Sequence, residues 1–175
     1  MTSILKSSHV ISSEVRFDRL LISMMNIIFE NSGADRGAII LKEEKYGVCA
    51  YGCQDEQVIT YDPPKPLHDA DELVPCNIIN HTIHTGDSIF IYDVQKDTRF
   101  AVGPWFDCTG KKSVICMPVT HKSRTMGCLV IEGAVGAFTQ RHVTVLSLLC
   151  QQMGISTANA SLFKSVQRAT TANMR

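Results

Sequence analysis

Apolar and polar positions recur along the chain with two different periods, which predicts a mixture of helices and strands. Starting near Asp18, apolar residues recur every three or four positions up to Ile28, and the Asn-Ser-Gly sequence at 31 to 33 is a helix stop. The apolar runs 37 to 41 and 46 to 53 have the length and composition of buried strands. The charged residues between these two runs predict an antiparallel hairpin.

The middle of the chain predicts two more strands and a helix. Residues 58 to 61 are apolar enough for a third strand, whereas 62 to 66 hold three prolines. Each proline restricts its own φ and disfavours helix in the residue before it, so 62 to 66 is expected to be an extended connector that crosses the sheet edge. Apolar residues from 73 to 83 predict a helix that Gly86 closes as a left-handed cap. A short strand is expected over 88 to 92.

A long irregular connection is predicted from Asp93 to Lys111. Ordered loops of this length carry function more often than short ones. The connection contains three large aromatic side chains, namely Phe100, Trp105 and Phe106. One of these rings is expected to fill the core beneath the loop, and the others are candidates for the wall of a small-molecule pocket.

The last third of the chain predicts a hairpin followed by a long helix. Two strands joined by a tight turn occupy residues 112 to 133. Thr139 is a suitable N-cap for the helix, and Phe138 can pack against Val143 as a hydrophobic staple. A helix that continued to Ala169 would be about 45 Å long at 1.5 Å per residue. Its far half is therefore expected to leave the core.

The spacing along this helix leaves two interpretations open. Apolar and small residues at three-four spacing are compatible with the pairing of two such helices across a dimer; these are Val143, Leu146, Cys150, Met153, Thr157 and Ala160. The alternative is an amphipathic helix that lies wholly on its own sheet. The chain ends at Arg175, soon after this helix, as expected of a piece of a longer protein.

Composition narrows the class of protein. With 175 residues, 45% of them apolar and 19% charged, the chain predicts one globular domain. Seventeen basic residues balance seventeen acidic ones, so nucleic acid and anionic membrane surfaces are not expected partners. No apolar run is long enough to span a bilayer. The seven cysteines are scattered and include no CxxC pair, which argues against a disulfide framework or a zinc site and favours a reducing, cytoplasmic compartment.

Several blocks of sequence occur in the order typical of one known family. They are residues 13–15 with 17–21, 30–37, 97–100 with 104–105, 112–118 and 136–139. Through these blocks the chain resembles a GAF domain over nearly its whole length, and more narrowly the GAF domains of multi-domain sensor histidine kinases of fungi and bacteria. The resemblance implies an α+β, profilin-like fold with about six antiparallel strands, terminal helices packed on one face and a ligand pocket on the other.

The resemblance also implies boundaries and candidate residues. Residues 14 to 160 would form the GAF domain, 1 to 13 a helical extension before it, and 161 to 175 a helical extension toward an output domain. The pocket would lie under the Asp93 to Lys111 connection, and its cofactor or ligand is unknown. Candidate pocket residues are Tyr92, Phe100, Trp105, Phe106, Ser113, Cys116 and Glu132. Cys108 is the candidate for a redox-active thiol, because its loop would leave it accessible.

Other ligand chemistries find weaker support in the sequence. The residue set that marks cyclic-nucleotide-binding GAF domains cannot be placed, and no cysteine is followed by the histidine that often accompanies a bilin linkage. His81 and His84 are three apart on a predicted helix and would share a face. A metal site is nevertheless not expected there, since no third ligand is in view.

The expected function is a non-catalytic sensory domain of a two-component signalling kinase. A small ligand or a redox event would be relayed through the terminal helices of a homodimer. Two alternatives remain open. One is an enzyme that resembles the GAF proteins that reduce free methionine sulfoxide, with Cys108 and Cys116 near the relevant region but without the loop motif. The other is a purely structural dimerisation module.

Overall fold

The computed structural model describes residues 13 to 100, 102 to 108, 110 and 112 to 173, with side chains in the two terminal helices described from 17 and up to 160. The expected helical extension over 1 to 13 therefore lies almost entirely outside the described residues. The first helix, α2 (Ser13–Ser32), buries Leu21, Met25 and Ile28 on one face. It ends where the sequence predicts, because Ser32 Oγ donates to the Ile28 carbonyl and Gly33 turns the chain at φ 63°.

Six strands form one antiparallel sheet in the order β3-β2-β1-β6-β5-β4. Their bounds are β1 (Arg36–Lys42), β2 (Tyr46–Cys53), β3 (Ile59–Pro66), β4 (Ile89–Ile91), β5 (Ser113–His121) and β6 (Arg124–Gly133). Both predicted hairpins, β1-β2 and β5-β6, are confirmed. They join through the pairing of β1 with β6 at the centre of the sheet, so the predicted α+β fold with six antiparallel strands is confirmed as well.

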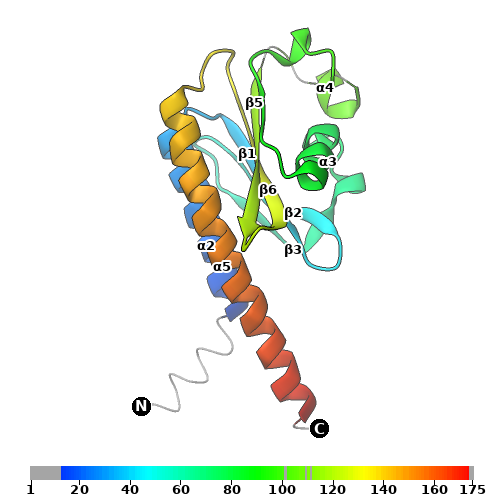
Figure 1. The fold of residues 1–175 in the computed structure, drawn as a ribbon, viewed down its shortest axis with the longest axis vertical. Helices are drawn as coiled ribbons and strands as arrows, with labels where there is room; N and C mark the ends of the chain where they lie inside the picture. Colours follow the sequence, from blue (N-terminus) through cyan, green and yellow to red (C-terminus); the bar gives the residue numbers. More distant parts are fainter. Residues whose placement is uncertain (1–12, 101, 109, 111, 174–175) are drawn as a thin grey trace.

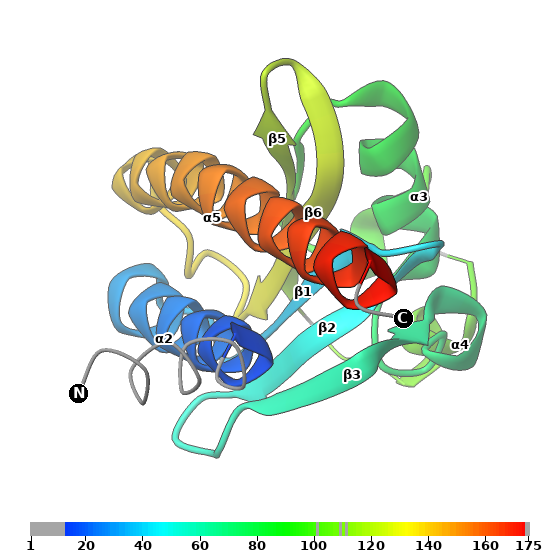
Figure 2. The same cartoon turned by 90° about the horizontal axis from the view of Figure 1, so that it is seen from below.

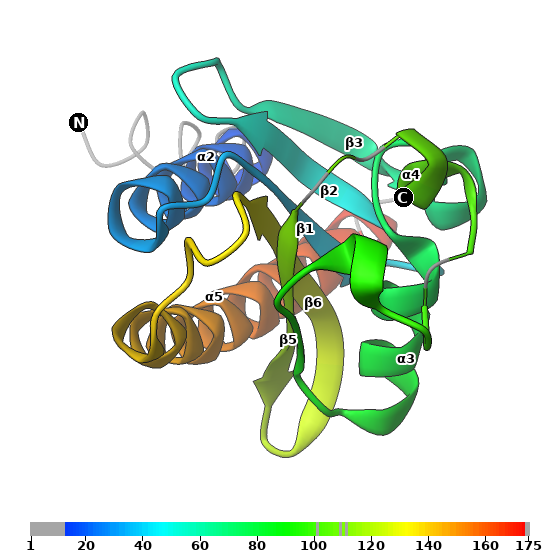
Figure 3. The same cartoon turned by 90° about the horizontal axis from the view of Figure 1, so that it is seen from above.

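Helices cover the sheet on both faces. Figures 2 and 3 show α2 and α5 (Gln140–Asn173) side by side on one face, with α3 (Cys76–Thr85) and the single-turn helix α4 (Pro104–Cys108) on the other. Successive side chains of β6 point to opposite faces of the sheet, as in any strand. Leu129 belongs to the apolar cluster under α2 and α5, whereas Cys128 and Val130 belong to the cluster under α3. The sheet is therefore the only layer between two separate cores of the described residues.

The C-terminal helix α5 begins and extends as the sequence predicts. Thr139 Oγ1 accepts from the His142 N–H at 3.4 Å, and His142 Nδ1 accepts from the Thr139 N–H at 3.2 Å. Phe138 and Val143 pack against the same apolar cluster. The helix has 34 residues, which at 1.5 Å per residue makes it about 51 Å long. Figure 1 shows its C-terminal part extending beyond the sheet. None of the described helices is both long and apolar enough to cross a membrane.

The proline-rich segment 62 to 66 differs from its prediction. Instead of a separate connector it continues β3, with Lys65 opposite Val48 and Pro66 opposite Gly47. Proline lacks an N–H, but an edge strand needs ladder bonds on one side only and tolerates it. The predicted extended conformation is confirmed, whereas the predicted connector was wrong because the local rule for proline does not include the place of the strand in the sheet.

The segments around α3 and α4 also refine the prediction. Gly86 is the left-handed C-cap of α3, with φ 74° and its N–H donating to the Thr82 carbonyl, as expected. The helix begins at Cys76, after Pro75, so Leu73 precedes it. The connection from 93 to 111 is not irregular throughout: residues 94 to 96 form a 3-10 turn, and 104 to 108 form α4.

Candidate functional site

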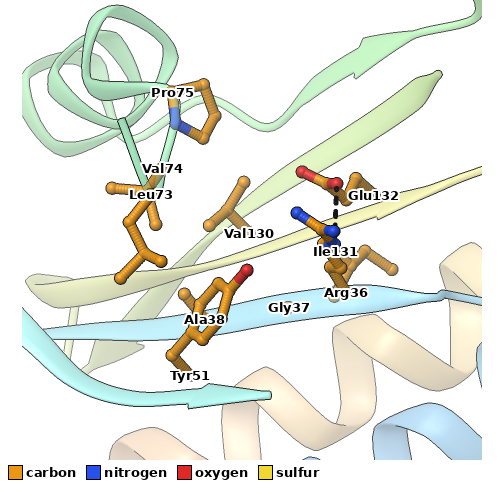
Figure 4. Close-up of a pocket in the computed structure, with 10 residues that line it drawn as sticks. All are labelled: Arg36, Gly37, Ala38, Tyr51, Leu73, Val74, Pro75, Val130, Ile131 and Glu132. Carbon is orange, nitrogen blue, oxygen red and sulfur yellow. Dashed lines mark ion pairs between the residues drawn. The ribbon is translucent and has the colours of Figure 1, made fainter. Parts of the chain in front are cut away.

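The pairing of β1 with its two neighbours gathers polar side chains at one end of the sheet. Arg36 lies opposite Cys53 of β2 and opposite Glu132 of β6. The Arg36 Nε lies 3.9 Å from Glu132 Oε1, and Figure 4 shows this ion pair beside a pocket. Arg36 is followed on the same face by Ala38 and Ile40 of the apolar cluster under α3. The polar end of the sheet therefore adjoins an apolar floor.

The pocket itself lies between this end of the sheet and the segment that leads into α3 (Figure 4). Its lining consists of Arg36, Gly37, Ala38, Tyr51, Leu73, Val74, Pro75, Val130, Ile131 and Glu132. The internal volume is about 10 Å³, which is the space for about one water molecule. The described conformation is thus closed to a molecule with several heavy atoms.

Trp105 of α4 contacts the site through Glu132. Its Nε1–H donates to Glu132 Oε2 at 3.2 Å, and the residue is only 4% exposed. The indole packs in the apolar cluster that includes Val74 and Val130, which also line the pocket. Phe106 stands edge-on to it with ring centroids 4.8 Å apart. A buried carboxylate and a buried indole therefore satisfy one another at the rim of the pocket.

The Glu132 carboxyl group has a raised pKa. Burial is the main cause, because it disfavours the charged form. Arg36 and Lys112 lower the pKa as nearby positive charges, the Trp105 N–H lowers it by donating to the carboxylate, and Asp35 raises it. Lys112 Nζ is itself bonded to Asp35 Oδ2 at 2.7 Å. Glu132 is therefore a hydrogen-bond acceptor whose pKa is set by burial and by the neighbouring groups Arg36, Lys112, Asp35 and Trp105.

Tyr51 and Cys53 of β2 complete the polar end. Burial raises the pKa of Tyr51 to about 12, with Cys53 as the next cause. The hydroxyl is thus neutral near pH 7 and can both donate and accept. The Cys53 Sγ–H lies 4.0 Å from this hydroxyl as a weak donor. Arg36, Tyr51 and residues 73 to 75 lie in or next to segments that the sequence assigns to regular elements, and none of them is among the predicted pocket residues.

The other predicted pocket residues are spread over two regions. Ser113 is buried, where its Oγ donates to the Tyr92 carbonyl at 2.5 Å and accepts from the Gly136 N–H at 3.2 Å. Tyr92 is 72% exposed, and a Cβ on Gly136 would lie 3.2 Å from its hydroxyl. Phe100 is half-buried, edge-on to His81 at 5.3 Å and under Arg99 at 5.2 Å. Of the seven predicted residues, Glu132 alone lines the pocket of Figure 4.

The cysteines differ in exposure: one is exposed, two are half-buried and four are buried. Cys108 is exposed at the end of α4, which fits the accessible thiol that the sequence predicts. Cys116 is fully buried and lies within hydrogen-bonding reach of Cys128, whose pKa is raised well above its usual value, first by burial. A thiol that solvent and substrate cannot reach is a poor nucleophile, and Cys116 is 0% exposed. Cys116 therefore serves the core, and its assignment to a pocket remains a prediction.

The histidine pair on α3 does not converge on a common point. His84 Nδ1 is bonded to the Asn80 carbonyl at 2.8 Å, while His81 faces the Phe100 ring. Among the described residues, no group of three His, Cys, Asp or Glu side chains is arranged to hold a metal ion.

Comparison with protein families gives one clear match. A family model described as the GAF domain matches residues 16 to 157, which is most of the chain. Solved structures share the fold at low identity. The GAF domain of a two-component sensor histidine kinase from Bacillus halodurans has a TM-score of 0.60 at 16% identity, over 84% of this chain and 97% of that one. A type II free methionine-R-sulfoxide reductase from Thermoplasma acidophilum has a TM-score of 0.58 at 16% identity, over 81% and 92%.

Curated relatives are much longer proteins. The peroxide stress-activated histidine kinase mak3 of Schizosaccharomyces pombe is 29% identical over 99% of this chain, which spans 7% of the kinase. The hybrid signal transduction histidine kinase G of Dictyostelium discoideum is 42% identical over 53% of this chain, or 3% of that protein. The chain is thus homologous to a small part of these histidine kinases.

Proposed function

The chain belongs to the GAF domain family, and from this premise we propose that it is a non-catalytic sensory domain of a multi-domain histidine kinase. A small ligand binds on the α3 face of the sheet, at the polar end formed by Arg36, Tyr51 and Glu132. The terminal helices on the opposite face carry the signal to an output domain. We infer further that the parent protein is a two-component histidine kinase, since its relatives are histidine kinases by name, and that it works in the cytoplasm.

The carrying observation is that one sheet separates the pocket from the output helix. On β5, Cys116 belongs to the cluster on the pocket face, whereas Ile115 and Met117 belong to the cluster under α5. A ligand that moved the end of β6 would therefore move the surface on which α5 rests. Such a ligand can bias the output only through its different affinities for the two helix arrangements.

Homodimerisation is part of the proposal. Large apolar side chains remain exposed on the terminal helices, namely Ile27 on α2 with 41% exposure, and Leu148 and Ile155 on α5 with 61% and 45%. Leu148 and Ile155 are seven positions apart and so lie on one face of the helix. A second copy that paired along these helices would cover them and bring the two α5 C-termini together.

The proposal is tested by exchanging the corresponding segment of mak3 for this chain and measuring autophosphorylation of the chimeric kinase. Glu132→Leu and Arg36→Leu are expected to change the output, because they alter the polar end of the pocket. Gln95→Glu is the matched control, since Gln95 is exposed on the same side of the sheet. Equal output from all variants would favour the structural dimerisation module instead.

The enzymatic alternative has its own assay. The 175-residue chain is incubated with free methionine sulfoxide and a thiol reductant, and methionine formation is measured. We expect no turnover, because Cys116 is buried in the core and only Cys108 of the two candidate thiols is exposed. Turnover that disappeared in Cys108→Ser would overturn the non-catalytic assignment.

A further inference from the structure

We propose that the ligand site of this domain is occupied by its own Trp105 indole, and that the ligand is a flat N–H-bearing heteroaromatic molecule that displaces this indole from Glu132. The inference rests on the ligand-sensing role proposed above and names the class of ligand. It also assigns Trp105 the role of an internal competitor.

Trp105 lies deeper in the fold than the residues around it on α4. α4 has only five residues and is the one described α-helix in the connection between β4 and β5, where a 3-10 turn over 94 to 96 precedes it. Its neighbours Phe106 and Cys108 are half-buried and exposed, yet Trp105 is 4% exposed. Burial of an indole removes on the order of 200 Å² from water. Trp105 is therefore the anchor by which this short helix is held to the sheet.

The Trp105 indole has a buried carboxylate as its hydrogen-bond partner. A tryptophan with a purely structural role needs one acceptor, and a main-chain carbonyl serves at little cost. Here the acceptor is the Glu132 carboxylate, which is 8% exposed. Burying a carboxylate is costly unless it is paired, and the Arg36 Nε is 3.9 Å away, beyond hydrogen-bond distance. Glu132 is thus poised to accept a strong bond from an aromatic N–H on this face.

Little space remains beside Glu132 while the Trp105 indole is in place. The volume beside Glu132 holds about one water molecule, and the apolar residues Val74 and Val130 contribute both to the pocket wall and to the cluster around Trp105. Withdrawal of the indole would join its volume to the pocket. Apolar cavities left by a deleted side chain can bind small aromatic molecules. The site would then take a ring of similar size, with its N–H toward Glu132.

The test compares probes that differ only in the N–H. Trp105→Ala is titrated with indole and with 1-methylindole by calorimetry, after circular dichroism has shown that the variant is folded. We expect indole to bind about tenfold to a hundredfold more tightly, as a hydrogen bond to a charged group implies. The preference should vanish in Trp105→Ala/Glu132→Leu, and wild type should bind indole at least tenfold more weakly because its own indole holds the site.

A measurement on the wild type covers the case in which Trp105→Ala does not fold. Trp105 is the one tryptophan of the chain, so its emission reports the site directly. Benzimidazole is expected to shift this emission to the red and increase its quenching by acrylamide, whereas 1-methylbenzimidazole should do so at least tenfold less effectively. Equal effects of the two probes, no effect of either, or equal indole affinity of wild type and Trp105→Ala would each overturn the inference.

The proposed function can fail separately. The purified chain could retain a native ligand while Trp105 still emits as a buried indole. That result would overturn the displacement of Trp105 and leave the sensory role intact. Conversely, an N–H preference in Trp105→Ala together with a mak3 chimera that ignores Arg36→Leu and Glu132→Leu would overturn the sensory role alone.

Discussion

At the scale of single residues, Glu132 has the most unusual environment of the site. Its pKa is raised by burial, although Arg36, Lys112 and the Trp105 N–H each act in the opposite direction. The native state consequently holds the Glu132 proton at pH values where the unfolded chain has released it. The free energy of unfolding should therefore contain a contribution from this carboxyl that is present at low pH and lost as pH rises.

Substitution of Glu132 makes this a measurable prediction. Because the pKa of Glu132 is raised in the folded state, the wild type starts to lose free energy of unfolding near the usual pKa of 4.5. This loss grows as pH rises toward the pKa of the folded state. Glu132→Gln has no proton to lose, so its stability relative to wild type should increase with pH across this window in urea unfolding. Asp69→Asn is the control for the loss of an acidic side chain at an exposed position. A constant difference between Glu132→Gln and wild type from pH 4 to about 7 would contradict the assignment.

A second residue-scale prediction concerns the N-cap of α5. Thr139 Oγ1 accepts from the His142 N–H, and the two residues bond reciprocally. Loss of such a cap typically costs about 0.5–2 kcal/mol, so Thr139→Ala should lower the free energy of unfolding by this amount in a denaturant titration. Thr139→Ser keeps the acceptor and should remain within about 0.5 kcal/mol of wild type. A Thr139→Ser variant as unstable as Thr139→Ala would argue that the methyl group, rather than the cap, matters.

How far the sequence predicts this molecule depends on the range of the signal. Gly33, Gly86 and Thr139 act on their own neighbours in the chain, and the structure confirms the helix boundary at each. The site depends on long-range pairing instead. Arg36 reaches Glu132 only because β1 lies beside β6. Periodicity within a strand indicates which face each residue occupies, but it does not identify which distant strand becomes the partner.

At the scale of elements, Gly154 illustrates the same limit. From the sequence alone, a glycine inside a helix is expected to destabilise that helix, since alanine is favoured there by about 1 kcal/mol. In the structure a Cβ at this position would lie 2.0 Å from the Thr120 carbonyl oxygen of β5. Gly154 is thus a point at which α5 lies directly against the backbone of β5. Its role depends on a tertiary contact that no local rule contains.

Gly154→Ala should therefore destabilise the chain in spite of helix propensity. Overpacking a tight contact costs about 1–3 kcal/mol, which exceeds the propensity gain, and the displaced helix should also change its packing on β5. Thermal unfolding by circular dichroism measures the loss. Ser147→Ala is the matched control, because Ser147 is exposed on the same helix and alanine there should be neutral or slightly stabilising. A Gly154→Ala variant more stable than wild type would show that α5 can stand further from the sheet.

At the scale of the whole molecule, the two faces of the sheet carry different structural features. The α3 face contains the polar end and the indole, while the α5 face contains a helix that continues past the core. The same strands serve both faces, because β5 and β6 contribute alternate residues to each cluster. Under the proposed function, a change at Glu132 would reach α5 through close-packed side chains, which have few intermediate arrangements.

Dimer formation through the terminal helices provides the last prediction. The exposed side chains Leu148 and Ile155 share one face of α5, and in water such a face is costly unless a partner covers it. The double variant Leu148→Glu/Ile155→Glu should therefore shift the chain from dimer to monomer in sedimentation velocity without changing its circular dichroism. Gln95→Glu adds the same kind of charge on the opposite side of the sheet and should leave the dimer intact. If the double variant remained dimeric, pairing would have to use another surface, and a signal from Glu132 would reach the output through a single α5 rather than through a helix pair.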